Sequence, residues 1–258
     1  MAIMLIMNRR HALLNVASLA SMVVQANSGV PQPYKASLIS GGKVEGLWRA
    51  GILIELEPDW KTYWRVPGDA GIPPQFDWAG SVNMQTVDVG FPVPVRFQDA
   101  SGEAIGYHDK VVFLLSIKPA SSDQKIQLKL NMFFAVCKGV CIPAKARLDA
   151  VLDASNSNPL LATWQQRVPA AGDVVSNARL EMREGKSMLV LKLSRPVRDI
   201  FVEADTQIYF GQPRFDISPG EAWLPLANTK NMPDLQNMAL KLTLSTGNTG
   251  IEQIITVN

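Results

Sequence analysis

The only two cysteines of this chain, Cys137 and Cys141, are separated by three residues in the segment Cys137-Lys138-Gly139-Val140-Cys141. So close a pair can form a disulfide, but on chain-entropy grounds a loop of this length would stabilise the fold by only about 2 kcal/mol. A structural disulfide normally joins distant segments, so the spacing favours reversible redox chemistry. The spacing leaves open two alternatives, an inert surface disulfide and two buried thiols.

The residues around the cysteines predict a β-hairpin. An apolar strand runs to Val136, and residues 138–140 fit a three-residue loop in which Gly139 can adopt the left-handed conformation. Cys137 and Cys141 would then lie opposite each other, close enough for a disulfide. On a helix, by contrast, the Cβ atoms of residues four apart are about 5–6 Å from each other, too far for an easy bond.

The neighbouring side chains suit a reactive thiol. Lys138 is an adjacent cation, and the nearest acids in the sequence are Asp123 and Asp149. A nearby cation with few local anions favours the thiolate, which is the nucleophilic form of cysteine. Phe133 and Phe134 are expected to shield the pair from solvent.

The N-terminus indicates export from the cytoplasm. Arg9 and Arg10 precede an apolar run over residues 12–24, and Ala26 provides a small residue at the expected cleavage position. This order of a basic region, a short apolar region and a small residue is typical of a cleavable signal peptide. We therefore predict a signal peptide over residues 1–26 and a periplasmic location, where disulfides can persist.

Composition narrows the class of function. Without residues 1–26 the chain would lose two arginines and no acid, leaving 23 basic and 23 acidic residues. A neutral chain gives no electrostatic support for nucleic-acid binding. His108 would be its only histidine, which argues against a zinc site or a Ser-His-Asp triad. No later stretch has 18 consecutive apolar residues, so we expect a soluble mature protein.

Period-two alternation of apolar and polar residues predicts strands along most of the chain. The clearest strands cover residues 47–57, 111–117, 125–132, 187–193, 239–244 and 251–257. Turn signals separate them, which favours an all-β protein built of sandwiches. One helix is predicted within residues 157–167, because capping residues and Pro159 precede it and Pro169 follows.

These elements suggest four parts of the chain. They are the signal peptide (1–26), a first β-sandwich domain (30–152), a connector with a short helix (153–172) and a second β-sandwich-like domain (173–258). The larger aromatic residues are interpreted as core and rim packing and not as a ligand cage. This interpretation covers Trp48, Trp60, Tyr63, Trp64, Trp78 and Trp223.

Two segments together resemble a known family. They are residues 58–78, which include Trp60-Lys61-Thr62-Tyr63-Trp64-Arg65 and Phe76-Asp77-Trp78, and residues 135–143 around the cysteines. Their order and spacing resemble the N-terminal periplasmic domain of DsbD/ScsB-type thiol:disulfide interchange proteins. The resemblance extends over about residues 34–152. The second half, including Phe201-Val202-Glu203, is similar to the second immunoglobulin-like portion of the ScsB branch.

The resemblance implies an immunoglobulin-like β-sandwich that carries a redox-active cysteine pair. Such domains take electrons from a membrane-embedded partner and pass them to periplasmic disulfide proteins. Carried over, Cys141 forms the mixed disulfide and Cys137 resolves it, and no bound cofactor is required. Residues 106–109 are a candidate counterpart of the aromatic cap loop that covers the cysteines in the DsbD branch.

This chain departs from the family in two ways. The cysteine spacing is shorter than in the best-known DsbD form and closer to that of the ScsB branch. Full family members also continue into membrane and thioredoxin-like domains, whereas this sequence ends at Asn258. We therefore expect a separate membrane-embedded thiol protein as the electron donor, and periplasmic disulfide or thioredoxin-like proteins as the acceptors.

Two other functions remain as alternatives. One is a non-enzymatic binding or scaffold module in which Cys137 and Cys141 form a minor local clasp. The other is Cu(I) handling by the two thiols, with the Met132 thioether as a third soft ligand. Methionine in the apolar series of a strand is more often a packing residue.

Overall fold

Alternating sequence patterns form strands in the computed structural model, as predicted. The structure describes residues 32–68, 71–99, 102–153, 157–204, 208–216, 220–227 and 235–258. The predicted signal peptide, residues 1–26, lies outside these residues. Each of the clearest predicted strands is present, with ends that differ by at most a few residues except after residue 132, where the strand continues to Lys138.

The first domain consists of two antiparallel sheets packed face to face. The first sheet has the order β1-β2-β8-β5. Its strands are β1 (Tyr34–Val44), β2 (Leu47–Leu56), β8 (Lys110–Pro119) and β5 (Met84–Gly90). The second has the order β10-β9-β3-β7-β6, with β4 paired to β9. Its strands are β10 (Val140–Val151), β9 (Gln127–Lys138), β3 (Lys61–Gly68), β7 (Gly102–His108), β6 (Val95–Asp99) and β4 (Gln75–Asp77).

The core of the first domain lies between these sheets. Ile52 and Ile54 of β2 and Phe113 of β8 meet Leu128 and Leu130 of β9, and all five side chains are at most 2% exposed. Burying one such side chain stabilises a fold by about 1.5–3 kcal/mol. The apolar face of each strand is therefore held inward, and its other face is left for surface chemistry.

The predicted helix is α1 (Pro159–Gln165). Asn158 caps it by accepting a hydrogen bond from the Leu160 backbone amide, and Pro159 occupies the first turn. Leu161 and Trp164 are buried against the first-domain core. In the described part of the chain, no helix has the length and apolar character needed to cross a membrane.

The second domain is also a pair of sheets. One has the order β11-β19-β18-β14, and the other β12-β13-β17-β15, with β16 paired to β17. The strands are β11 (Ala170–Ala171), β12 (Val175–Arg183), β13 (Lys186–Leu193), β14 (Asp199–Glu203), β15 (Tyr209–Phe210), β16 (Arg214–Asp216), β17 (Glu221–Ala227), β18 (Ala239–Ser245) and β19 (Gly250–Thr256). Leu189 and Leu191 of β13, Leu224 of β17 and Leu242 of β18 are fully buried in its own core.

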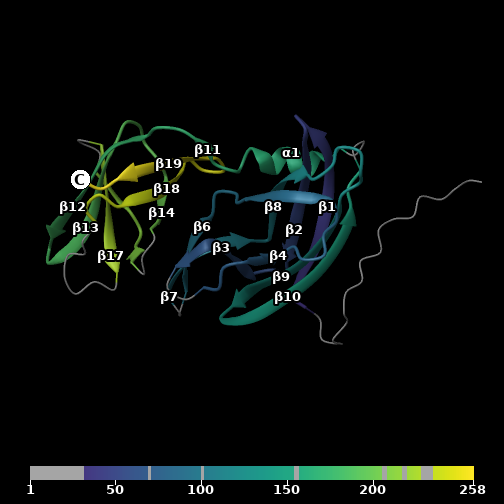
Figure 1. Cartoon of the computed structure of the whole chain (residues 1–258). Helices are drawn as coiled ribbons and strands as arrows, with labels where there is room; N and C mark the ends of the chain where they lie inside the picture. The colour runs from purple at the N-terminus through teal and green to yellow at the C-terminus, as the bar shows by residue number, and fades with distance from the viewer. Residues whose placement is uncertain are drawn as a thin grey trace, which may run out of the picture.

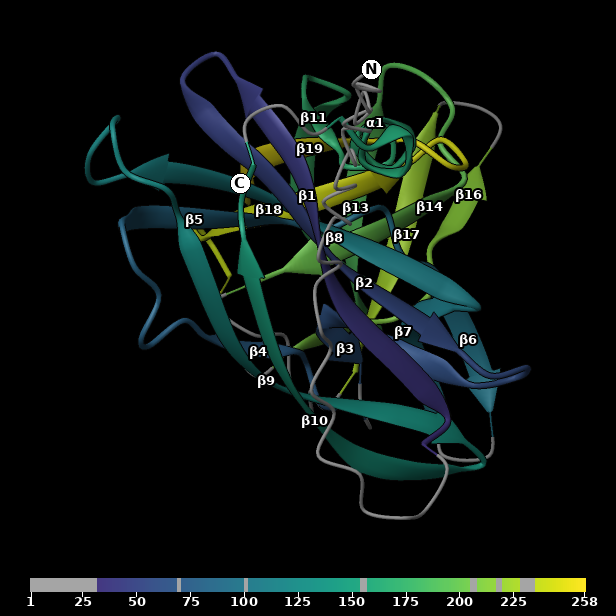
Figure 2. The same ribbon diagram turned by 90° about the vertical axis from the view of Figure 1, so that its right-hand side faces the viewer.

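The chain is thus all-β, with two immunoglobulin-like sandwiches in tandem, as predicted. Figure 1 shows the domains side by side, with the chain passing from one to the other through α1 and β11. In the perpendicular view of Figure 2, the long β9–β10 hairpin curves along the lower part of the first domain. That hairpin carries both cysteines.

Candidate functional site

The β9–β10 hairpin places the two cysteines directly opposite each other. Cys141 pairs with Cys137 and Val140 pairs with Lys138, so the chain reverses at Gly139. Gly139 has φ of 75°, in the left-handed region that glycine adopts at little cost. The two Sγ atoms are 2.8 Å apart and are not joined by a disulfide in this structure. The hairpin predicted from the sequence is therefore confirmed.

Replacing Gly139 by alanine should destabilise the hairpin without any steric clash. A Cβ at this position would meet no atom within 4 Å, so the cost is the left-handed backbone alone, about 1–2 kcal/mol. Asparagine tolerates this conformation better, so Gly139→Asn should recover most of the loss. Chemical denaturation of the three proteins checks this, and equal losses for alanine and asparagine would contradict it.

The two thiols differ in accessibility. Cys137 is only 2% exposed, whereas Cys141 is partly exposed. Cys137 packs with Tyr63, Ala104 and Ala135 in a small apolar cluster on the face of the sheet that points away from the main core. Ile72 and Phe97 pack against this cluster. Only Cys141 is therefore open to a partner, while Cys137 is held behind it.

A tyrosine hydroxyl completes the arrangement. Tyr63 Oη lies 2.8 Å from Cys141 Sγ, and the Tyr63 side chain is buried. Burial raises the pKa of Tyr63, and the hydrogen bonds and negative charge of Cys141 and Cys137 raise it further. Tyr63 therefore stays protonated over the pH range in which thiols ionise. It can donate a hydrogen bond to a thiolate at Cys141, which would favour the reactive form.

The close packing of β7 and β9 against β3 holds Tyr63 in place. The Thr62 hydroxyl donates to the Ala135 carbonyl at 2.9 Å, which ties β3 to the cysteine strand. On the other side, Gly106 opposes Tyr63, and a Cβ on Gly106 would lie 2.0 Å from the Thr62 carbonyl oxygen. Only glycine allows β7 to approach β3 this closely.

Comparison with known protein families agrees with the paired thiols of the first domain. Residues 34–153 match the family model described as thiol:disulfide interchange protein DsbD, N-terminal. The first domain is a DsbD N-terminal domain. Residues 167–258 match the model of a domain of unknown function, DUF8393. The match to the thiol:disulfide interchange family thus concerns the first domain, residues 34–153.

The fold is also similar to a solved structure, the N-terminal periplasmic domain of ScsB from Proteus mirabilis. The two are 20% identical, the TM-score is 0.69, and the match covers 88% of this chain and 94% of that one. At this identity the likeness concerns the fold of both domains. Comparison with curated protein sequences gave no match.

Two other solved structures align with low scores that do not indicate a common fold. The YadV chaperone has 10% identity and a TM-score of 0.25, covering 87% of this chain and 100% of that chain. The C-terminal domain of the Streptococcus pyogenes antigen I/II-family protein AspA has 7% identity and a TM-score of 0.18, covering 87% and 98%.

In this DsbD N-terminal domain, the predicted role of Lys138 is not supported. Its ammonium group lies 3.0 Å from the Asp59 carboxylate and 3.2 Å from the Pro58 carbonyl oxygen. Along the sequence, the acids nearest to Lys138 are Asp123 and Asp149. In the structure the nearby acid is Asp59, which comes from the loop between β2 and β3. Successive side chains of a strand point to opposite faces of the sheet, so Lys138 does not point to the same face as Cys137. It forms an ion pair with Asp59 at the surface and is not a cation facing the thiols.

Two predicted neighbours of the thiols lie on the opposite face of β9. Phe134 is fully buried in the main core beside Tyr34, so it does not shield the cysteines. Met132 is 2% exposed in the same core. The structure therefore does not bring the Met132 thioether to Cys137 and Cys141. Among the described residues, no group of three or more His, Cys, Asp or Glu side chains is arranged to hold a metal ion.

The cap proposed at residues 106–109 is also wrong for this DsbD N-terminal domain. Tyr107 is 5% exposed in the main core and donates its hydroxyl to the Pro92 carbonyl at 2.8 Å. His108 is exposed and paired with Asp109 at 2.6 Å. The apolar side chains that pack against the thiol cluster are instead Ile72, from the loop after β3, and Phe97 of β6.

Proposed function

We propose that this protein is a periplasmic thiol:disulfide interchange protein that relays reducing equivalents through Cys137 and Cys141. The observation that carries the proposal is the difference between the two paired thiols. Cys141 is partly exposed and receives the Tyr63 hydroxyl, whereas Cys137 is buried 2.8 Å behind it. A relay needs this combination of one sulfur that partners can reach and one that only the first sulfur can reach.

The exchange proceeds in two substitutions at sulfur. The Cys141 thiolate attacks one sulfur of a partner disulfide, forming a mixed disulfide and releasing the other partner sulfur as a thiolate. The Cys137 thiolate then attacks Cys141 Sγ, forming the Cys137–Cys141 disulfide and releasing the second partner thiolate. The partner gains two electrons and, after protonation, two protons. A thiol donor reverses both steps to reduce the pair, and no bound cofactor takes part.

The surface around Cys141 supports docking of a protein partner. Val140 and Ile142, which flank Cys141 in the chain, are 72% and 42% exposed. Exposed apolar side chains beside a reactive group offer area for a transient protein contact. The partners we propose are a membrane-embedded thiol protein and periplasmic disulfide or thioredoxin-like proteins.

The location and boundaries belong to the same proposal. We infer a cleaved signal peptide over residues 1–26, in keeping with the family of the first domain. The exchanging domain covers residues 30–152, a connector with α1 covers residues 153–172, and the second sandwich covers residues 173–258.

The reduction potential of the Cys137–Cys141 pair tests the proposal. Alkylation of the protein across graded thiol buffers, read as a mass shift, gives this value. A potential between about −120 and −270 mV lies in the range of known exchange proteins. A value below about −300 mV would mark a structural bond, and the binding-module function would then take its place. Tight Cu(I) binding with little thiol exchange would instead favour copper handling.

A further inference from the structure

Strand β3 contacts both the thiol pair and the second domain within a few residues. Tyr63 reaches Cys141, and the next two residues, Trp64 and Arg65, reach the second domain. The strand bulges here, because β3 advances from Tyr63 to Gly68 while its partner β7 advances only from Gly106 to Ala104. Trp64 and Arg65 lie within this irregular stretch, and both contact the second domain.

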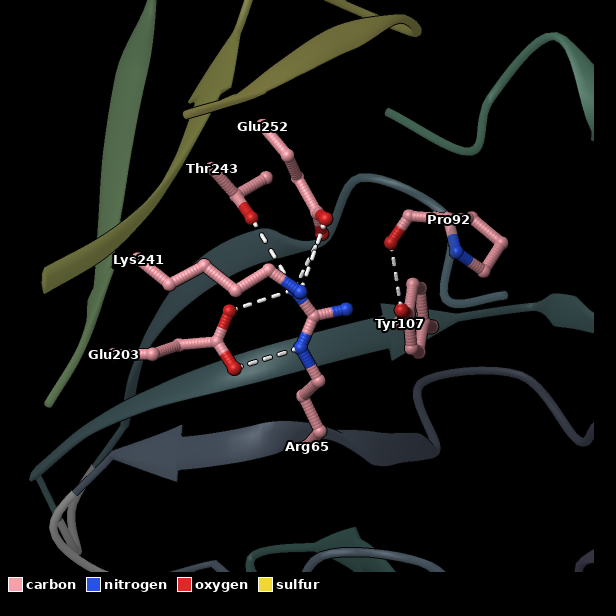
Figure 3. A network of polar contacts seen from close by, with 7 residues as sticks. All are labelled: Arg65, Pro92, Tyr107, Glu203, Lys241, Thr243 and Glu252. Carbon is pink, nitrogen blue, oxygen red and sulfur yellow. Dashed lines mark hydrogen bonds and ion pairs between the residues drawn. The ribbon is translucent and has the colours of Figure 1, made fainter. Parts of the chain in front are cut away.

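Arg65 is bound by two carboxylates of the second domain. Its Nε and Nη2 lie 2.8 and 2.6 Å from the two oxygens of Glu203 on β14, in a bidentate pair. Nη2 also lies 2.6 Å from Glu252 on β19 and 3.4 Å from the Thr243 hydroxyl. Figure 3 shows the guanidinium group between the two carboxylates, with Lys241 approaching Glu252. We refer to Arg65, Glu203 and Glu252 as the Arg65 clamp.

Aromatic contacts and a second arginine support the Arg65 clamp. The rings of Trp64 and Phe201 are 5.7 Å apart across the junction. Arg96 of β6 lies over the Phe201 ring and binds Asp199 at 3.1 and 3.2 Å. The Arg96 side chain is only 6% exposed, so its guanidinium group is largely shielded from solvent. The junction therefore fixes the bulged part of β3 relative to the second domain.

The Arg65 clamp is strong enough to constrain the strand. Burial by itself would lower the pKa of Arg65, but the hydrogen bonds and charges of Glu203 and Glu252 outweigh it and raise the pKa. Arg65 therefore remains a cation, and a bidentate guanidinium–carboxylate pair fixes direction as well as distance. Removing one side would leave partly buried charge without its partner, which is costly.

We propose that the second domain tunes the exchange chemistry through the Arg65 clamp, which holds β3 so that the Tyr63 hydroxyl stays on Cys141. Arg65, Glu203 and Glu252 are positioning residues in this arrangement, because they act on the thiols only through Tyr63. This inference rests on the proposed function for its biological meaning. The coupling between the domain junction and Cys141 does not depend on which partner the protein has.

The experiment follows the pH profile of Cys141 alkylation in the reduced full chain, in two backgrounds. In a Cys137→Ser protein, where Cys141 is the only thiol, Arg65→Gln should raise the midpoint of the profile by about half a pH unit, a size common for coupled neighbours. The same substitution should cause no shift once Tyr63→Phe is also present. Arg179→Gln is the matched control, because it removes an arginine that pairs with Glu181 and Glu221 inside the second domain.

Two results would overturn the proposal. One is an Arg65→Gln midpoint equal to that of Arg179→Gln, and the other is a shift of the same size with and without Tyr63. If Arg65→Gln does not fold, Glu252→Gln decides by the same two criteria, since it weakens the clamp from the other domain. Alkylation needs no exchange partner, so a structural reduction potential for the pair would refute the proposed function while leaving this coupling measurable.

Discussion

Replacing Cys141 by serine is expected to reduce the rate of thiol–disulfide exchange at least about a hundredfold, because it removes the attacking sulfur. Cys137 is too deeply buried, at 2% exposed, to attack a partner in its place. Serine is close to cysteine in size and accepts the Tyr63 hydrogen bond, so the fold should be kept. The measurement is reduction of an oxidised thioredoxin-like protein by the prereduced chain in a single turnover.

The matched variant Cys137→Ser separates attack from resolution. Cys141 still attacks, but no second thiolate lies behind it, so the mixed disulfide should accumulate and survive non-reducing electrophoresis. Peptide mapping should place the linkage at Cys141. A mixed disulfide formed through Cys137 in the Cys141→Ser protein would reverse the two roles. Fast turnover by both single variants would remove the pair from the mechanism.

The hairpin was predictable because all its determinants are local. The apolar run to Val136, the glycine at 139 and the spacing of the cysteines act within a dozen residues, and the observed register follows from them. The face of the sheet on which each residue of β9 lies could also be predicted from the sequence. Met132 and Cys137 are an odd number of positions apart, so on one strand they face opposite sides of the sheet. Applied to the sequence alone, that rule excludes Met132 from the thiol site.

The role of Tyr63 could not be predicted from the sequence, because it depends on pairing between distant strands. Tyr63 and Cys141 are 78 residues apart, and only the order β10-β9-β3 brings them together. In the sequence, Tyr63 is one of several aromatic residues in a strand-like segment, where packing is the more frequent role. The contact of Asp59 with Lys138 could not be predicted for the same reason. Asp59 lies just before β3, and β3 lies next to β9 in the sheet although the two strands are far apart in the sequence.

The Arg65 clamp could not be predicted from the sequence for a different reason. An arginine within a strand normally indicates a solvated face, and nothing near Arg65 in the sequence identifies Glu203 or Glu252 as its partners. Arg65 also lies in a stretch of β3 where the register with β7 changes. Such a change depends on the packing of a whole sheet. The sequence therefore predicts each sandwich better than the junction between them.

Replacing Tyr63 by phenylalanine should move the pH profile of Cys141 alkylation upward by about one unit. A hydrogen bond to a charged group contributes about 1.5–3 kcal/mol, and about 1.4 kcal/mol corresponds to one unit. The sign follows from the charge. The hydroxyl stabilises the thiolate more than the thiol, so without it a higher pH is needed for the same thiolate fraction. The raised pKa of Tyr63 ensures that the wild-type hydroxyl remains a donor throughout.

The alkylation rate at neutral pH should change less than the midpoint. The thiolate fraction falls about tenfold, but a more basic thiolate is also more nucleophilic, with a Brønsted coefficient of about 0.4–0.5. These effects offset each other in part, so the net rate should fall only about threefold. The full pH profile is therefore the decisive measurement, recorded in the Cys137→Ser protein so that only one thiol reacts.

Tyr107→Phe is the matched control for this prediction. Tyr107 is also a buried tyrosine on the strand next to β3, but its hydroxyl binds the Pro92 carbonyl on the core side. Removing that hydroxyl should destabilise the protein by about 1 kcal/mol and leave the alkylation profile unchanged. If Tyr63→Phe also leaves the profile unchanged, then in the 2.8 Å contact it is the Cys141 thiol that donates to the phenol oxygen, and the thiolate gains nothing from Tyr63.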